Sequence, residues 1–361
     1  MRNLDSKKWI MIVLFNVLTF FLICGVSIFI LDPYFHYRKP NNGLVYYKVD
    51  NDPDAERYMN SGIIRSYEYD AVIVGTSMAE NFKTSEFDSL FEAESVKLPI
   101  SGGSFREVNE ICEMALIEQP DMRIVLRGLD LSGIDVDKDL VQYDSFPDYL
   151  YNHNRLDDIN YLLSKDALLR GCVSHIIIST IMRREPFDFD NYANWNNTAS
   201  FGRAAVLSTY ERAVKSEDII LLSEAEREVI RGNIEQNVIE LASTYPDTRF
   251  VLFFTPYSIC YWDALSQEGT LMKNIQIQEE VIEMLIPYKN IELYSFCNNF
   301  EVVCNLDNYK DRGHYSEDVN SDILHWIAEG EYRITEDNYK KYLEDITDFY
   351  SSYNYDDIYR K

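Results

Sequence analysis

An uncharged apolar stretch is the feature that most constrains what this chain of 361 residues can fold into. It runs from Ile10 to Leu31, and its only polar side chains are Asn16, Thr19 and Ser27. A helix of this length can cross a hydrocarbon core of about 30 Å. We therefore predict that residues 10–31 form a single transmembrane helix and that no later segment reaches membrane length.

The charges beside this stretch predict its orientation. Arg2, Lys7 and Lys8 precede it, which favours a cytoplasmic N-terminus and an extracytoplasmic position for the rest of the chain. Arg38 and Lys39 follow it and weaken this bias. A cleaved signal peptide is the alternative, but such peptides have shorter apolar regions and a small-residue cleavage site, which is missing here. We therefore expect an uncleaved anchor in the cell membrane.

Beyond the anchor, short apolar segments alternate with segments of helical periodicity. This alternation predicts an α/β fold of flavodoxin-like type, with a mostly parallel sheet and helices on both faces. In such a sheet, active sites lie at the carboxyl ends of the strands. The predicted strands are 71–75, 95–98, 122–127, 249–254 and 291–295, and the predicted helices are 78–90, 104–118, 266–287 and 316–329.

Residues 136–245 interrupt the alternation and predict a helical insertion. We expect helices at 157–169 and 177–184, and a third that begins with the capping box at 223–226 and ends near residue 244. The insertion forms either a cap over the site or a surface segment. The predicted organisation is a cytoplasmic tail at 1–9, the anchor at 10–31, an irregular linker at 32–66, the α/β domain at 67–330 and an acidic tail at 331–361, in which a helix over 335–350 packs on the outside.

Two short motifs about 235 residues apart carry the chemistry. Gly75–Met78, with the sequence Gly-Thr-Ser-Met, follows the first strand, and Asp311–His314, with the sequence Asp-Arg-Gly-His, lies near the C-terminal end. A serine is a poor nucleophile alone and needs a base, and the base needs an orienting partner. We therefore predict a catalytic triad of Ser77, His314 and Asp311.

These motifs, in this order on an α/β pattern, resemble those of the SGNH/GDSL hydrolase family. In that family the first block carries a serine after the first strand, and the last block is Asp-x-x-His. The likeness covers roughly residues 68–330. Because an anchor precedes the domain, the chain looks most similar to the DltD-like, polysaccharide O-acyltransferase-type branch. The resemblance implies a serine acyltransferase or esterase that handles acetyl or D-alanyl groups of a cell-surface carbohydrate or polymer, with a polytopic membrane acyltransferase as partner.

The same resemblance implies where an oxyanion hole would form. The family's second block supplies a glycine N–H, and Gly102 and Gly103 follow the predicted strand at 95–98. The alternative is an ordinary strand-to-helix turn, in which two glycines are common. With the backbone N–H of Ser77, the N–H of Gly103 is the expected donor pair.

The third block of the family normally supplies an asparagine amide. Here Asp130 stands at that place, and a carboxylate cannot donate a hydrogen bond unless it is protonated. Asn81 or Asn109 is a possible substitute. The departure also leaves open a second hypothesis, that the chain is a non-catalytic assembly or polymer-binding protein that keeps the fold.

Two aromatic residues are candidates for lining a substrate pocket. Tyr257 follows the predicted strand at 249–254, and Trp195 lies in an irregular aromatic stretch of the insertion. A turn or a surface loop without function is the alternative for each.

Charge and cysteine content exclude other classes. The net charge of −26 argues against a nucleic-acid partner, which needs clustered Lys and Arg. No Cys or His spacing indicates a metal site, and we expect no cofactor. Cys297 and Cys304 either pair in an oxidising compartment or remain free thiols.

Overall fold

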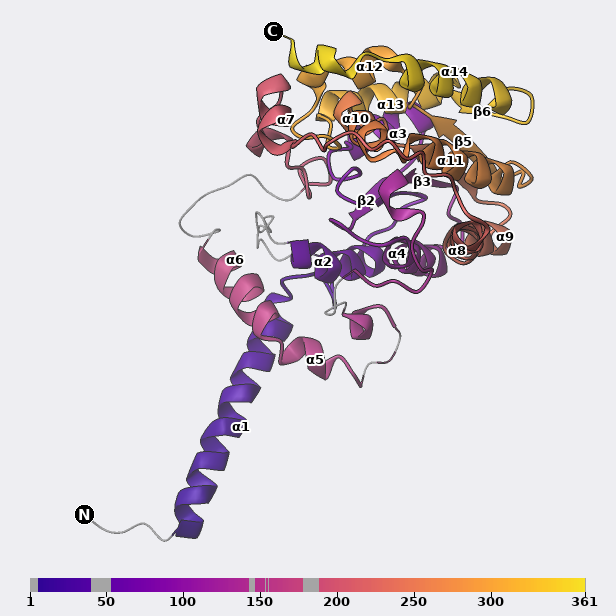
Figure 1. Cartoon of the computed structure of the whole chain (residues 1–361). Helices are drawn as coiled ribbons and strands as arrows, with labels where there is room; N and C mark the ends of the chain where they lie inside the picture. The colour runs from indigo at the N-terminus through magenta and orange to yellow at the C-terminus, as the bar shows by residue number, and fades with distance from the viewer. Residues whose placement is uncertain are drawn as a thin grey trace. The chain divides into compact units, whose positions relative to one another are not determined.

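The computed structural model describes residues 6–39, 53–142, 147–152, 154, 156–177 and 188–360. The chain divides into two compact units (Figure 1). The first consists of Met1–Tyr67 and Ser145–Phe187, and the second of Glu68–Asp144 and Asp188–Lys361. The segment predicted as an insertion over 136–245 is therefore divided, because residues 145–187 belong to the first unit while residues 136–144 and 188–245 belong to the second.

A six-stranded sheet forms the centre of the second unit, in the order β2-β1-β3-β4-β5-β6. The first five strands are parallel, and β6 is antiparallel to β5 at one edge. This confirms the predicted α/β class and mostly parallel sheet, and the order 2-1-3-4-5 is that of flavodoxin-like doubly wound sheets. The strands are β1 Ala71–Gly75, β2 Ser95–Pro99, β3 Ile124–Leu129, β4 Arg249–Phe254, β5 Ile291–Ser295 and β6 Arg333–Ile334.

Helices cover both faces of this sheet. Crossovers between parallel strands are right-handed, so the chain path from β1 outward to β2 and back to β3 puts α3 on one face and α4 on the other. The helix contacts agree, because α3 packs on α13 while α11 packs on α8 and α14. The helices of this unit are α3 Thr84–Phe91, α4 Phe105–Glu118, α7 Arg203–Thr209, α8 Glu224–Ile234, α9 Glu240–Thr244, α10 Ile259–Glu268, α11 Leu271–Leu285, α12 Phe300–Cys304, α13 Glu317–Glu329 and α14 Tyr339–Ser352.

Several element boundaries differ from the prediction, for local reasons. The helix predicted over 266–287 is two helices, because Gly269 ends α10 with a φ of 76°, the left-handed conformation that glycine adopts at helix ends. The helix predicted from residue 78 begins only at Thr84, and the preceding residues form a tight turn. The helix predicted over 223–244 is present, with a π-helical turn at Glu235–Ile239 between α8 and α9.

The helix predicted over 335–350 is present as α14, Tyr339–Ser352, and the C-terminal segment packs closely on the sheet unit rather than extending from it as a tail. β6 extends the sheet, and α14 packs against α11. The ring of Tyr350 on α14 stacks on Trp262 with centroids 3.7 Å apart, and both side chains are fully buried. The Tyr350 hydroxyl donates to the carbonyl of Cys297 at 2.5 Å.

The first unit contains the N-terminal helix α1, Ser6–Leu31, which is long and apolar enough to cross a membrane. The helix begins before residue 10, so part of the predicted tail at 1–9 is helical. The linker predicted over 32–66 contains a helix, α2 Pro53–Ser66, in its second half. The helix predicted over 157–169 is divided. The chain forms α5 Ile159–Leu162, a π-helical turn η3 Ala167–Val173 and α6 Ser174–Ile177. The helix predicted over 177–184 lies almost entirely outside the described residues.

All six cysteines are free thiols. Cys297 is buried and donates to the carbonyl of Thr255, whereas Cys304 is partly exposed. Of the two alternatives for this pair, the structure therefore has unpaired thiols.

The buried stack of Tyr350 on Trp262 leads to a stability prediction. Tyr350→Ala should lower the free energy of unfolding by about 3–5 kcal/mol, because it leaves a cavity in a site of nearly complete burial. Tyr359→Ala, at a tyrosine that is 42% exposed, is the control and should change it by less than about 0.5 kcal/mol. Urea unfolding of the purified protein measures both. Equal, small effects would mean that the segment after residue 331 packs as a tail after all.

Candidate active site

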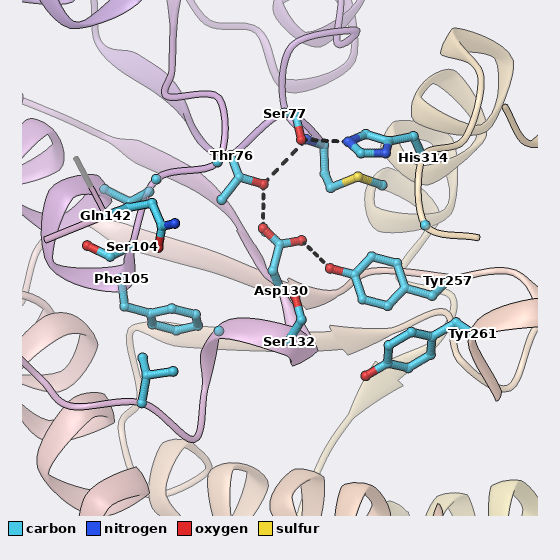
Figure 2. Close-up of a pocket in the computed structure, with 18 of the residues that line it drawn as sticks. Thr76, Ser77, Ser104, Phe105, Asp130, Ser132, Gln142, Tyr257, Tyr261 and His314 are labelled. Carbon is cyan, nitrogen blue, oxygen red and sulfur yellow. Dashed lines mark hydrogen bonds between the residues drawn. The ribbon is translucent and has the colours of Figure 1, made fainter. Parts of the chain in front are cut away.

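Ser77 and His314 lie side by side at the carboxyl edge of the sheet (Figure 2), and Asp311 contacts His314. The Ser77 Oγ is 2.8 Å from Nε2 of His314, and Nδ1 of His314 is 2.8 Å from Oδ2 and 3.0 Å from Oδ1 of Asp311. The side chains of His314 and Asp311 are 31% and 28% exposed, so the group is accessible from solvent. The geometry is that of a nucleophile, a base and an orienting carboxylate.

The hydrogen bonds assign the tautomer of the imidazole. Because the Asp311 carboxylate only accepts, Nδ1 of His314 carries the proton, and Nε2 is left to accept from the Ser77 hydroxyl. Burial raises the pKa of Asp311, but the hydrogen bonds and charge of His314 and the backbone N–H groups of His314 and Gly313 outweigh it and lower that pKa to about 2. Asp311 is therefore ionised at neutral pH, as an orienting partner must be.

The turn that carries Ser77 is held by side chains from three other segments. The indole N–H of Trp195 donates to the Ser77 carbonyl at 3.2 Å, and the amide of Asn320 on α13 donates to the carbonyl of Met78 at 3.1 Å. The buried ammonium of Lys97 on β2 donates to the carbonyls of Glu80 and Phe82 at 2.5 and 2.8 Å. The sequence predicted a helix directly after Ser77, but α3 begins only at Thr84. These side-chain contacts hold the turn in place of that helix.

The turn that carries His314 is held by the loop after β4. The backbone N–H and the hydroxyl of Ser258 both donate to the carbonyl of Arg312, at 3.1 and 2.8 Å. The hydroxyl of Tyr309 donates to the carbonyl of Pro256 at 2.6 Å. The loop following β4 therefore holds the imidazole opposite the serine.

Two backbone N–H groups of residues that line the cavity have no hydrogen-bond acceptor among the described residues. They belong to Ser77 and Gly102, and they are the candidate donors to an oxyanion. The N–H of Gly103 donates to the carbonyl of Ile100 at 2.9 Å, so it is not the free donor that we predicted. Gly102 has a φ of 62°, and a Cβ at Gly103 would lie 1.9 Å from Cγ2 of Ile100, so this turn requires glycine at both positions.

Asp130 lies beside the triad but does not offer a third donor. Its carboxyl accepts from the hydroxyl of Thr76 at 2.5 Å and from the hydroxyl of Tyr257 at 3.0 Å. Burial raises the pKa of Asp130. The two hydrogen bonds and the nearby charges of His314 and Arg127 lower it, but the effect of burial is larger. Both carboxyl oxygens act as acceptors in this arrangement, so Asp130 does not replace the amide donor whose presence the sequence had put in doubt.

The remaining predicted residues have different places. Tyr257 lines the cavity beside the triad, as predicted. Trp195 is not among the residues that line it; its indole supports Ser77 and meets the ring of His314 edge-on, with centroids 5.6 Å apart. Asn81 is buried, and its Oδ1 accepts from the backbone N–H of Trp195, while Asn109 lies at a different hollow of the surface. Neither asparagine substitutes for the missing amide.

A cavity of about 550 Å³ opens in front of Ser77. This volume is within the range of pockets that bind small organic ligands. The cavity has a mixed lining. Its polar and aromatic residues include Ser77, Asp130, Ser132, Tyr257, Tyr261, Arg312 and His314, and its apolar residues include Phe105, Val108, Val136 and Leu140.

Sequence analysis missed the supporting residues Lys97 and Asn320, and it singled out Trp195 for a different role, as a pocket-lining residue. Of the two missed residues, only Lys97 had a signal, as a charged residue inside an otherwise apolar strand. Within the described ranges, no group of three or more His, Cys, Asp or Glu side chains is arranged to hold a metal ion.

No protein-family model matches this chain, and no curated protein matches it by sequence. The residues of the site itself are therefore the basis for a proposed function.

The ionisation of Asp130 leads to a pH prediction. Its folded-state pKa is raised above the ordinary 3.8, so its contribution to stability is complete below about pH 3.8 and is lost as pH rises through the folded pKa. Asp130→Asn removes this loss, and the stability of the variant relative to the unmodified protein should increase from pH 4 to pH 8. Urea unfolding at both pH values measures it.

Asp311→Asn is the control, because a lowered pKa has the opposite sign: its contribution is present above pH 3.8 and lost toward pH 2. A relative stability of Asp130→Asn that is the same at pH 4 and pH 8 would show that the carboxyl is not perturbed by its site.

Proposed function

We propose that this protein is a membrane-anchored serine acyltransferase or esterase, which acts on acyl groups of a cell-surface carbohydrate or polymer through an acyl-serine intermediate. The observation that carries the proposal is the continuous hydrogen-bond chain from Ser77 through His314 to Asp311 at an open cavity. A non-catalytic binding protein has no requirement for a correctly oriented imidazole between a serine and an ionised carboxylate.

The proposed reaction follows from these contacts. Ser77 Oγ attacks the acyl carbonyl while Nε2 of His314 takes the hydroxyl proton, and the resulting imidazolium is stabilised by Asp311. The oxyanion is held by the N–H groups of Ser77 and Gly102. His314 then gives its proton to the departing oxygen or sulfur, which leaves an acyl-serine. In the second half, a hydroxyl or water attacks this ester while His314 takes the proton of the attacking group. The bond between the acyl carbon and Ser77 Oγ then breaks, and His314 returns its proton to Oγ, which regenerates both residues.

The cavity and the anchor favour transfer over simple hydrolysis. A cavity of about 550 Å³ is larger than a two-carbon acyl group needs, so an acceptor has space beside it. The linker between α2 of the first unit and β1 of the sheet consists of residues 67–70 and is therefore short. A site tethered to a bilayer meets a membrane-bound acyl donor at high effective concentration, whereas an esterase for soluble substrates gains little from the tether.

The proposed nucleophile is tested with a fluorophosphonate probe on the full-length protein in detergent. The probe should label the unmodified protein at Ser77, and Ser77→Ala should abolish the labelling. His314→Ala and Asp311→Asn should slow it by roughly 10³–10⁴-fold, because each leaves the hydroxyl without an oriented base. Ser104→Ala, at another serine that lines the cavity, is the matched control and should label at the normal rate. Labelling that persists in Ser77→Ala would refute the proposed nucleophile.

Transfer is separated from hydrolysis in cells. Ser77→Ala should remove the acyl groups of the surface polymer while the protein stays folded and anchored, because the acyl-serine can no longer form. The purified protein should hydrolyse small acetyl esters slowly, since water is then the wrong acceptor. Acyl content is measured by chemical release from isolated envelopes. Unchanged acyl content together with rapid ester hydrolysis would favour the hydrolase.

A further inference from the structure

The first unit carries a row of exposed apolar side chains next to the anchor helix. Residues 156–177, comprising α5, η3 and α6, are here called the collar. In the collar, large apolar side chains are between 41% and 86% exposed, although soluble surfaces rarely gather so many in one short segment. They are Leu156, Ile159, Leu163, Leu169, Val173, Ile176 and Ile177.

The spacing of three of these side chains places them on one side of the collar. Leu169, Val173 and Ile176 follow one another at intervals of four and three residues, the spacing of neighbours on a helix surface. Ala167 and Cys172, in the same segment, are buried. The collar is therefore amphipathic, with some side chains packed inside the unit and an apolar face whose side chains are exposed.

The collar lies beside the C-terminal end of α1, where this helix would leave the membrane. Both α5 and η3 contact α1, and Figure 1 shows α5 and α6 flanking its upper end. A Cβ on Gly25 would lie 3.5 Å from the carbonyl oxygen of Leu162. Farther along, a Cβ on Gly171 would lie 2.6 Å from Cγ of Pro33, so the collar also packs closely on the residues that follow α1.

These contacts fix the depth of the collar relative to the anchor. Gly25 precedes Leu31 by six residues, which is about 9 Å along a helix axis. If the apolar run of α1 spans the bilayer, Leu162 lies at a level within that run and below its exit. A helix whose apolar face reaches 5–10 Å below the headgroups is the arrangement of interfacial amphipathic helices.

Neighbouring residues suit the same interface. Tyr37 packs on Phe29 with ring centroids 5.0 Å apart, and aromatic rings are typical of the headgroup level. Arg170 pairs with Asp166 at 3.5 Å, and Lys165 is exposed, so the charged groups of this segment can remain at the headgroup level while the apolar chains enter the bilayer.

We propose that the collar is a second membrane contact, an interfacial segment whose apolar face is embedded in the leaflet at which α1 emerges. The occupant of this face is lipid, because the face continues the apolar surface of α1 at the same depth. The proposal rests on the membrane span of α1, which belongs to the proposed function. Its consequence is that the first unit is held at the bilayer by two elements and cannot rotate freely about a single helix.

The test uses the full-length protein in nanodiscs of phosphatidylcholine and phosphatidylglycerol. Cys24 and Cys304, the two native thiols that are not fully buried, are replaced by serine. Single cysteines at Leu163 and Ile176 carry a bimane label. Quenching is measured with lipids that bear a nitroxide near the headgroup or deep in the acyl chain, and with iodide in water. We expect shallow-nitroxide quenching of both labels to be several-fold stronger than that of a label at Val214, and iodide quenching several-fold weaker.

Two reference labels separate the collar from the anchor. Val214 is 94% exposed in the second unit, and Leu18 is 69% exposed in the middle of α1. Deep quenching at Leu18 with iodide access at Leu163 and Ile176 equal to that at Val214 would overturn the collar while leaving the anchor intact. No deep quenching at Leu18 would refute the anchor and the collar together. Labels that are shielded in native membranes but open to iodide in pure lipid would assign the face to a partner protein instead.

Discussion

The hydrogen bond between Ser77 and His314 joins segments 237 residues apart, and the parallel sheet makes it possible. Because β1 lies between β2 and β3, the turns after these three strands leave the sheet at one edge. Those turns supply Ser77, Gly102 and Asp130. The histidine comes from no strand end, but its turn is bound to the loop after β4 through Ser258. Each part of the site therefore depends on the parallel register of four strands, as expected at the switch point of a doubly wound sheet.

The position of Ser77 depends on more than this sheet, because a turn is less rigid than a strand or a helix. Side chains of Lys97, Trp195 and Asn320 hold four carbonyls of the turn between residues 77 and 82. A buried lysine is costly unless its donors are satisfied, so the position of Lys97 is explained by the carbonyls that it binds. Such outer contacts keep reacting groups within the small tolerances that catalysis requires.

The sequence predicted the parts of the molecule whose signal is local. The five strands from β1 to β5, the triad and the apolar helix α1 each follow from a short pattern such as a β-branched run or a motif. Most failures involve long-range partners. The burial of Tyr350 depends on Trp262, which lies 88 positions earlier. The hydrogen bond of Gly103 to Ile100 is local, but it depends on the exact conformation of a turn. The placement of 145–187 with the anchor also has no local signal, because it depends on contacts with residues such as Gly25 and Pro33.

The aspartate at position 130 has a consequence for the kind of acyl donor. Its two oxygens accept from Thr76 and Tyr257, which leaves two backbone donors for an oxyanion. Loss of one donor from an oxyanion hole typically costs about 10²–10³ in rate. A two-donor site therefore suits an acyl group that is already activated, since such a donor has a lower barrier than a simple ester. This agrees with the proposed transfer from a membrane-bound donor. In that proposal the tether raises the effective concentration of the donor, and an activated donor lowers the barrier of acyl transfer. The triad then provides the nucleophile and the proton transfers.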